Sequence, residues 1–257
     1  MIEDINVHMC THIVYAFAVL NTQDFTIKIF DQWLDIDLEN YQKFVDLKKR
    51  NPDLKVLMAL GGWTDSQNHK AAYKKLFANS KNRQKFVKYF PYSFAHFEIF
   101  TKSGFFRSSV DFLQKWGFDG LDLDYEYPDG SDKSGFASWV KELKEAFEPH
   151  GYEVILQIQN RFISENPDFF FQLTAAISAS PGKISKGYDI ELMAKYMDAI
   201  HIMAYDLHGS WEKTADHHAP LYARYPILSE IPDFWDFLII VPKQEKVRKF
   251  VRSVRIL

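Results

Sequence analysis

The sequence has few of the features that mark membrane proteins, nucleic-acid-binding proteins or disulfide-rich proteins. Its 257 residues include one cysteine, Cys10, so no disulfide bond can form within the chain. No apolar run reaches the roughly 20 residues that a membrane-spanning helix needs. The net charge is −3, and no cluster of Lys and Arg is interleaved with aromatic residues as in a groove that follows phosphates. We therefore expect neither a membrane nor a nucleic acid as a partner.

The remaining composition is that of an ordinary globular protein, with 47% hydrophobic and 25% charged residues. The length suits one large domain or two small ones. Residues Met1 to Asp4 lack the basic and apolar stretches of a signal peptide. Apolar, β-rich runs alternate with amphipathic segments along the chain. Strands are expected at residues 11–19, 55–60, 120–125, 173–178 and 199–204, and helices at 38–49, 70–88, 109–116, 134–147 and 190–196, with Ser134 as a helix cap.

Such repeated strand and helix units indicate an α/β fold with a parallel sheet, either open or closed into a barrel. No glycine-rich phosphate loop follows the first strand, which argues against a nucleotide-binding sheet. Polar motifs follow the ends of three expected strands: Gly61 to Trp63, Asp124 with Glu126, and Met203 to Asp206. In a (β/α)₈ barrel, the carboxyl ends of the strands carry the active site.

The segment from Phe118 to Pro128 places a carboxylate at every second position of a buried-strand pattern. Asp122, Asp124 and Glu126 share one face, because strand side chains alternate. Neighbouring carboxylates on that face lie roughly 6 to 7 Å apart, so at least one is expected to stay protonated near neutral pH. A protonated acid beside an ionised one is an arrangement that cleaves acetals. The alternative is a solvated strand whose acids face water, although Asp is a poor strand former and like charges in register repel.

These motifs resemble those of the chitinases of glycoside hydrolase family 18, most closely the arthropod ones. The family's Asp-x-x-Asp-x-Asp-x-Glu signature is met by residues 119–126, and its glycine motif by residues 59–63, with Ala59 where the family often has Ser. Its Met-x-Tyr-Asp motif is met by residues 203–206, followed by a matching 208–211, and its second-strand pattern by residues 11–18. Four motifs in the family's order make this resemblance specific.

The resemblance implies a (β/α)₈ TIM barrel that hydrolyses β-1,4-linked N-acetylglucosamine polymers by a retaining, substrate-assisted mechanism. Glu126 would protonate the glycosidic oxygen, and the substrate's own acetamido oxygen would attack the anomeric carbon. Asp124 would orient the acetamido group, Asp122 would share a proton with Asp124, and Tyr205 would donate a hydrogen bond to the acetamido carbonyl. Substrate contacts are implied for Asp206, Met203, Trp63, Trp211, Phe17 and Tyr127, although aromatic residues near strand ends can equally belong to a core. Asp119 has the wrong parity for this face and is expected to support the start of the strand.

The same resemblance implies chitin or a chitooligosaccharide as the partner, an extracellular location and a monomer, with no cofactor. His208, His217 and His218 match no standard zinc spacing, so no metal site is expected. Two other function classes stay open. One is a glycan-binding relative without activity, which the presence of Glu126 disfavours. The other is an inactive fragment, because five of eight strands cannot close a barrel and leave two open sheet edges.

The sequence departs from the family at both ends and at two internal segments. It starts after the first barrel strand of the family, a stretch that in the family carries a cysteine paired with the equivalent of Cys10. Beyond about Tyr225 the counterparts of the seventh and eighth strands are absent. We therefore expect a single partial TIM-barrel domain over residues 1–257, with atypical segments at 89–107, 157–172 and 225–257. We interpret the two internal segments as translated non-coding sequence; the alternative is a pair of lineage-specific insertions.

Overall fold

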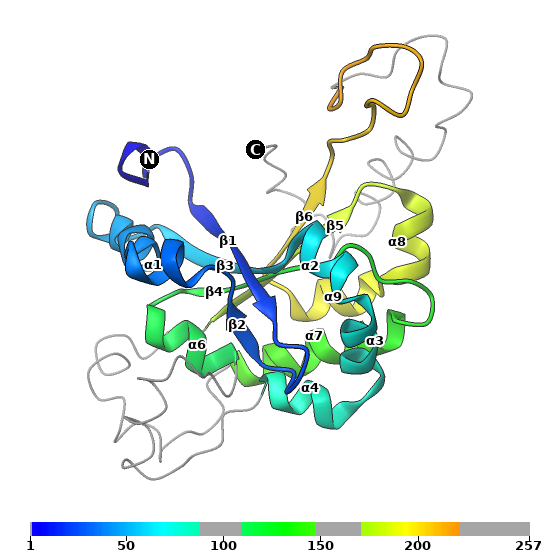
Figure 1. The fold of residues 1–257 in the computed structure, drawn as a ribbon, viewed down its shortest axis with the longest axis horizontal. Coiled ribbons are helices and arrows are strands. Elements are labelled where there is room, and N and C mark those ends of the chain that lie inside the picture. Colours follow the sequence, from blue (N-terminus) through cyan, green and yellow to red (C-terminus); the bar gives the residue numbers. More distant parts are fainter. Residues whose placement is uncertain (1, 88–108, 148–170, 221–257) are drawn as a thin grey trace.

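The computed structural model describes residues 2–87, 109–147 and 171–220, which build one six-stranded sheet and the helices around it (Figure 1). The spatial order of the strands is β2-β1-β3-β4-β5-β6. The parallel strands are β1 (His12–Leu20), β3 (Lys55–Gly61), β4 (Gly120–Asp124), β5 (Gln172–Ser178) and β6 (Ala199–Met203). All five expected strands and their parallel order are confirmed. The antiparallel edge strand β2 (Ile27–Ile29) was not predicted, because three residues are too few to show a period.

The helices follow the expected pattern with corrections at their boundaries. They are α1 (Asn40–Val45), α2 (Gly62–Asn68), α3 (Lys70–Ala78), α4 (Ser80–Val87), α6 (Ser109–Trp116), α7 (Lys133–Phe147), α8 (Pro181–Gly187) and α9 (Ile190–Tyr196). A π-helical turn, η2 (Trp33–Asp37), and two 3₁₀ turns, η1 (Ile2–Asp4) and η3 (Asp46–Lys49), complete the described elements. Helices α2 and α8 were not predicted.

Three expected helices differ in detail from the observed ones. The helix expected at 38–49 starts only at Asn40, because Glu39 adopts a left-handed φ of 58°, and it divides into α1 and η3. The helix expected at 70–88 is broken at Asn79, whose extended φ of −127° separates α3 from α4. The expected cap Ser134 lies inside the first turn of α7, which closes when the Phe136 N–H donates to the Asp132 carbonyl.

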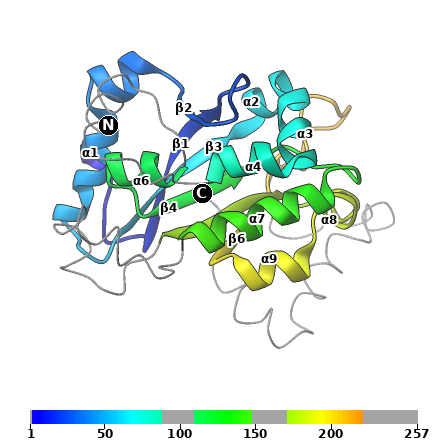
Figure 2. The same ribbon diagram turned by 90° about the horizontal axis from the view of Figure 1, so that it is seen from below.

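The two faces of the sheet have different surroundings. On one face, alternate strand residues belong to the hydrophobic core: Val56, Met58 and Leu60 of β3, Leu121 and Leu123 of β4, and Leu173, Ala175 and Ile177 of β5. Helices α6, α4, α7 and α9 follow one another in contact, and Figure 2 shows them layered along the strands. Burial of each large aliphatic side chain in such a core contributes about 1.5–3 kcal/mol. The intervening residues, including Asp122 and Asp124, therefore stand on the opposite face.

Aromatic packing fixes the carboxylate strand against this helical layer. The ring centroid of Tyr125, the residue after β4, lies 4.5 Å from that of Tyr73 on α3 and 5.2 Å from that of Phe77. Phe77 in turn packs against Phe136 and Trp139 of α7. These contacts fix Tyr125, the residue between Asp124 and Glu126, against the helices.

Asp119 supports the start of β4, as its parity predicts. Its carboxylate accepts hydrogen bonds from Lys48 Nζ at 3.0 Å and from the backbone N–H of Val56 at 2.8 Å. The carboxylate thereby joins β4 to β3 and to η3.

The expected atypical segments 89–107 and 225–257 lie outside the described residues, as does 157–170. Of the segment expected at 157–172, Phe171 packs against Phe147 at a centroid distance of 5.6 Å, and Gln172 is the first residue of β5. Cys10 is a partly buried free thiol. In the described ranges, every helix is too short or too polar to cross a bilayer.

Candidate active site

The expected carboxylates lie together at the carboxyl end of β4, on the face of the sheet opposite the helices. Asp122 is 5% exposed and Asp124 is 8% exposed, whereas Glu126, two residues beyond the strand, is half-buried. The three acids therefore form a series from the deepest, Asp122, to the most accessible, Glu126. Their charges act on one another, since both Asp122 and Glu126 raise the pKa of Asp124.

Asp122 is held by polar side chains from β5, which pairs with β4, and from β6, the strand beyond it. The Thr174 hydroxyl group on β5 donates a hydrogen bond to its Oδ1, and His201 Nε2 on β6 lies 3.6 Å from the same oxygen. Burial raises the pKa of Asp122, and the His201 imidazole and the Thr174 hydrogen bond lower it by a smaller amount. Sequence reasoning missed both partners, because neither belongs to a motif and only the register of the strands brings them to Asp122.

The environment of Asp124 favours its protonated form. Burial, followed by the charges of Glu126 and Asp122, raises its pKa to about 8. Its Oδ1 is buried and has no hydrogen-bond partner within the described part of the chain. A protonated carboxyl group between two other acids agrees with the expectation from their spacing.

Glu126 has its carboxyl group in a mixed electrostatic environment. Burial raises its pKa, a hydrogen bond with Tyr127 and the charge of Lys183 lower it, and the charge of Asp206 raises it. The Lys183 ammonium, on α8, lies 3.9 Å from the centroid of the Tyr127 ring. Lys183 was not singled out from the sequence, because α8 itself was not predicted.

The residues expected after β6 reach the same edge of the sheet. Tyr205 is 39% exposed, and burial together with the negative charges of Asp124 and Glu126 raises the pKa of its hydroxyl group. Asp206 is exposed, has a left-handed φ of 53°, and lies 3.7 Å from His218 Nδ1. Met203 is the half-buried last residue of β6. The fold thus brings Tyr205 and Asp206 into the electrostatic field of the carboxylates.

The expected groove aromatics occupy three different settings. Trp63, at the start of α2, is 59% exposed, and its ring centroid lies 6.5 Å from that of Tyr127. Phe17 is half-buried and packs so closely on Gly62 that a Cβ there would lie 2.9 Å from its ring. Trp211 is 66% exposed and lies against Gly209 of its own loop. Exposed Trp63 and half-buried Tyr127 therefore form an aromatic pair beside Glu126, whereas Trp211 stands in a separate loop.

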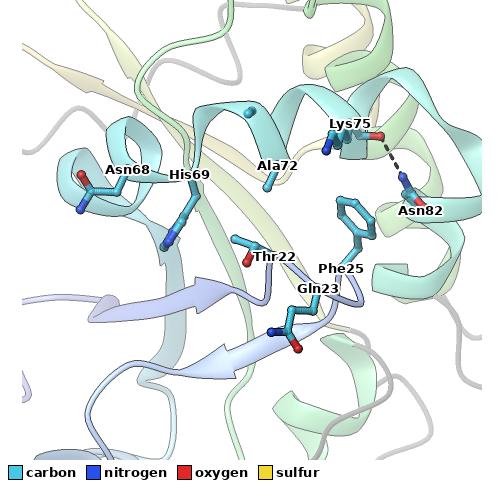
Figure 3. Close-up of a pocket in the computed structure, with 9 residues that line it drawn as sticks. Thr22, Gln23, Phe25, Asn68, His69, Ala72, Lys75 and Asn82 are labelled. Atoms are coloured by element: carbon cyan, nitrogen blue, oxygen red, sulfur yellow. Dashed lines mark hydrogen bonds between the residues drawn. The ribbon is translucent and has the colours of Figure 1, made fainter.

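A hollow of about 540 Å³ lies away from the carboxylates, between the β1–β2 turn and helices α2 to α4. Thr22, Gln23 and Phe25 line it from the turn. Thr22 and Phe25 lie on the side of the turn toward α3 (Figure 3). His69 lines it from the junction of α2 and α3, with Nδ1 2.7 Å from the buried carboxylate of Asp65. None of the carboxylates of β4 contributes to this hollow.

The described residues contain no group of three or more His, Cys, Asp or Glu side chains placed to hold a metal ion. Of the three histidines noted in the sequence, His208 pairs with Glu212 at 2.9 Å, and His218 pairs with Asp206.

Comparison with known proteins identifies the family of the chain. The sequence profile described as glycosyl hydrolases family 18 matches residues 2–244. The chain belongs to this family. Among curated family 18 relatives, a probable chitinase 10 of Drosophila melanogaster is 36% identical over 230 residues, covering 86% of this chain and 8% of the relative. An endochitinase of Manduca sexta is 33% identical over 230 residues, covering 87% and 34%.

Solved family 18 structures show the same fold. Catalytic domain 2 of the Group II chitinase of Ostrinia furnacalis is 38% identical, with a TM-score of 0.67 over 88% of this chain and 50% of that domain. The expectation of an incomplete TIM barrel is confirmed: the described strands form an open sheet whose five parallel members correspond to part of a (β/α)₈ barrel. The chain spans half the length of that domain and 8% to 39% of the length of the first curated relatives.

Proposed function

We propose that this protein hydrolyses β-1,4-linked N-acetylglucosamine polymers, with chitin or chitooligosaccharides as substrate. The observation that carries the proposal is the position of a buried Asp124, whose pKa is raised to about 8, beside the more accessible Glu126 at the end of β4. Glu126 has a raised pKa, as a general acid that works near neutral pH requires. Trp63 and Tyr127 beside it offer apolar rings on which a sugar can stack.

In the proposed mechanism, Glu126 donates its proton to the glycosidic oxygen as the bond to the anomeric carbon breaks. The acetamido oxygen of the substrate forms the new bond to that carbon, which gives a cyclic oxazolinium ion and no covalent enzyme adduct. Asp124 accepts a hydrogen bond from the acetamido N–H, and Asp122 shares a proton with Asp124. Tyr205 donates a hydrogen bond to the acetamido oxygen. The ionised Glu126 then takes a proton from water, which opens the ring with retention of configuration. Asp206, Met203, Phe17 and Trp211 complete the substrate contacts.

The relatives support this substrate class. The curated relatives above are named as chitinases, and catalytic domain 2 of the Ostrinia furnacalis enzyme was solved as a mutant with a bound chitooligosaccharide, (NAG)5. On the same family grounds, we place the protein outside the cell and expect it to act as a monomer.

A second candidate function is glycan binding without hydrolysis. An oviduct-specific glycoprotein of Sus scrofa is 34% identical over 228 residues, and its name states no enzymatic activity. Glu126 favours hydrolysis over this alternative, because a pure binding site has no need of a proton donor with a raised pKa.

Replacement of the acid tests the proposal. Glu126→Gln keeps the size of the side chain and removes its transferable proton, so turnover of a chromogenic chitooligosaccharide should fall about 10²- to 10⁴-fold. Binding of the same oligosaccharide, measured by calorimetry, should change little. The control is Glu191→Gln, an exposed position on α9, which should leave turnover intact. All proteins must first show a cooperative melt. A folded Glu126→Gln protein with wild-type turnover would falsify hydrolysis at this site, and oligosaccharide binding without turnover in the wild type would favour the glycan-binding function.

A further inference from the structure

Helix α2 is bonded to the backbone of Glu126 through two consecutive side chains. Oγ of Ser66 accepts a hydrogen bond from the Glu126 N–H at 3.0 Å and donates one to the carbonyl of Asp124 at 3.4 Å. Nε2 of Gln67 donates to the carbonyl of Glu126 at 2.5 Å. Both backbone polar groups of Glu126 are therefore satisfied by side chains of one helix.

These bonds replace a strand partner that the sheet does not supply. The ladder between β3 and β4 ends where Gly61 lies opposite Asp124, and the ladder between β4 and β5 ends one residue earlier. Glu126 lies beyond both ladders, where a partly buried N–H or carbonyl needs another partner. Helix α2 begins at Gly62, directly after the residue that pairs with Asp124, so it runs beside the end of β4.

The side chain of Ser66 is buried beside the end of β4. It is fully buried, at 0% exposure, where a hydroxyl group without hydrogen bonds would destabilise the fold. Both of its hydrogen bonds go to the chain on either side of Tyr125. The hydroxyl group thus spans the segment that joins the buried Asp124 to the accessible Glu126.

The helix that carries these side chains is itself fixed. The buried carboxylate of Asp65 accepts hydrogen bonds from the Tyr73 hydroxyl group at 2.6 Å and from the Leu20 N–H at 3.4 Å, and contacts His69 at 2.7 Å. Asp65 thereby anchors α2 to the end of β1 and to α3. A rigid support of this kind is what holds a reacting group within a fraction of an ångström of its working position.

We propose that Ser66 and Gln67 are positioning residues that fix the backbone of Glu126 and thereby aim its carboxyl group. The inference rests on the proposed function, since it assigns the aimed group a role in proton transfer. Neither side chain touches the reacting atoms in this account. A misplacement of about 1 Å at a catalytic group can cost on the order of 10²-fold in rate.

The test uses Ser66→Ala, which removes both hydrogen bonds, and Gln67→Glu, which keeps the length of the side chain but presents an oxygen to the Glu126 carbonyl. Matched controls are Ser138→Ala, whose hydroxyl group donates only to Ser134 on the exposed side of α7, and Gln84→Glu, an exposed position on α4. The readouts are kcat and KM on a chromogenic chitooligosaccharide, the exchange rate of the Glu126 amide proton by NMR, and the melting temperature.

We expect kcat to fall roughly 10- to 100-fold in both variants while KM stays within about twofold. The Glu126 amide should exchange at least about tenfold faster in Ser66→Ala, because its hydrogen-bond acceptor is gone. Both controls should match the wild type. If Ser66→Ala does not fold, Gln67→Glu carries the test, since Gln67 is exposed and its replacement leaves the core intact.

Failure of this inference is distinguishable from failure of the proposed function. If the Glu126 amide exchanges faster in Ser66→Ala than in the wild type, but the wild type does not cleave the substrate, the backbone tether is supported and hydrolysis is overturned. Unchanged exchange and unchanged kcat in folded Ser66→Ala and Gln67→Glu would overturn the tether. An equal loss of kcat in Ser138→Ala would overturn it as well, because the effect would then be one of general stability.

Discussion

Thr174 on β5 lies opposite Asp122 on β4 in the parallel pairing, and its hydroxyl group donates a hydrogen bond to Oδ1 of that carboxylate. Both residues are buried, at 2% and 5% exposure. A hydrogen bond to a carboxylate favours its ionised form, whereas burial favours the protonated form. The charge of Asp122 raises the pKa of Asp124, so the hydrogen bond from Thr174 bears on the protonation of both acids.

Removal of this hydrogen bond should shift the titration of the carboxylates. Thr174→Val keeps the shape of the side chain but has no hydroxyl group, so the pKa of Asp122 should rise further, and stability should fall by about 1 kcal/mol. The measurement is a carboxyl-carbon NMR titration of the labelled protein. Thr22→Val, at an exposed position, serves as control. An Asp122 titration curve identical to that of the wild type would contradict the assignment.

Stability should depend on pH through Asp124. Its pKa in the folded chain, about 8, lies above its ordinary value of 3.8, so the folded state binds this proton more tightly than the unfolded state. The resulting stabilisation is fully present below pH 3.8 and is lost as the pH rises through about 8. The urea midpoint should therefore fall between about pH 4 and pH 9.

Asp124→Asn should flatten this dependence, since the amide keeps the shape of the carboxyl group and does not titrate. Asp53→Asn, at an exposed position, should leave the slope as in the wild type. Urea titrations of the three proteins over this pH range make the comparison. The same slope in Asp124→Asn as in the wild type would assign the dependence to other groups.

Lys183 and Asp206 should move the activity profile in opposite directions. The charge of Lys183 lowers the pKa of Glu126, and the charge of Asp206 raises it. Lys183→Met should therefore shift the alkaline limb of kcat/KM to higher pH, because Glu126 keeps its proton longer, and Asp206→Asn should shift it to lower pH. Lys186→Met, on the exposed side of the same helix α8, is the control. High salt should reduce both shifts; shifts of the same sign would contradict this account.

Gly61 should not tolerate a side chain. It has a φ of 113°, and a Cβ atom there would collide with the backbone carbonyl of Asp124. Gly61→Ala should therefore destabilise the protein by more than about 1 kcal/mol. Gly130→Ala is the matched control, because its Cβ would have no neighbour closer than 4.0 Å and φ is unstrained there. Thermal melts of the two variants make the comparison, and equal melting temperatures would show that β3 and β4 can separate at this point without cost.

Local pattern was enough to predict the strands, whereas their order in the sheet followed from the resemblance to a barrel family. The period of two in residues 120–125 placed Leu121 and Leu123 in the core and Asp122 and Asp124 on the opposite face, because side-chain alternation is a property of any strand. The helix boundaries were less well predicted. Glu39 and Asn79 interrupt amphipathic patterns that continue across them, because a backbone break leaves no trace in hydrophobic period.

The sequence by itself determined the α/β alternation, the shared face of the three acids and the motifs that mark the family. Only the tertiary structure decided what surrounds those acids. Thr174 and His201 reach Asp122 through strand register, Lys183 reaches Tyr127 from α8, and Ser66 reaches the Glu126 backbone across 60 positions of sequence. The pKa of about 8 at Asp124 follows from burial, which depends on every element packed around β4. A motif specifies which groups are present, because residue identity is a local property. The pKa values and orientations of those groups depend on neighbours that are distant along the chain.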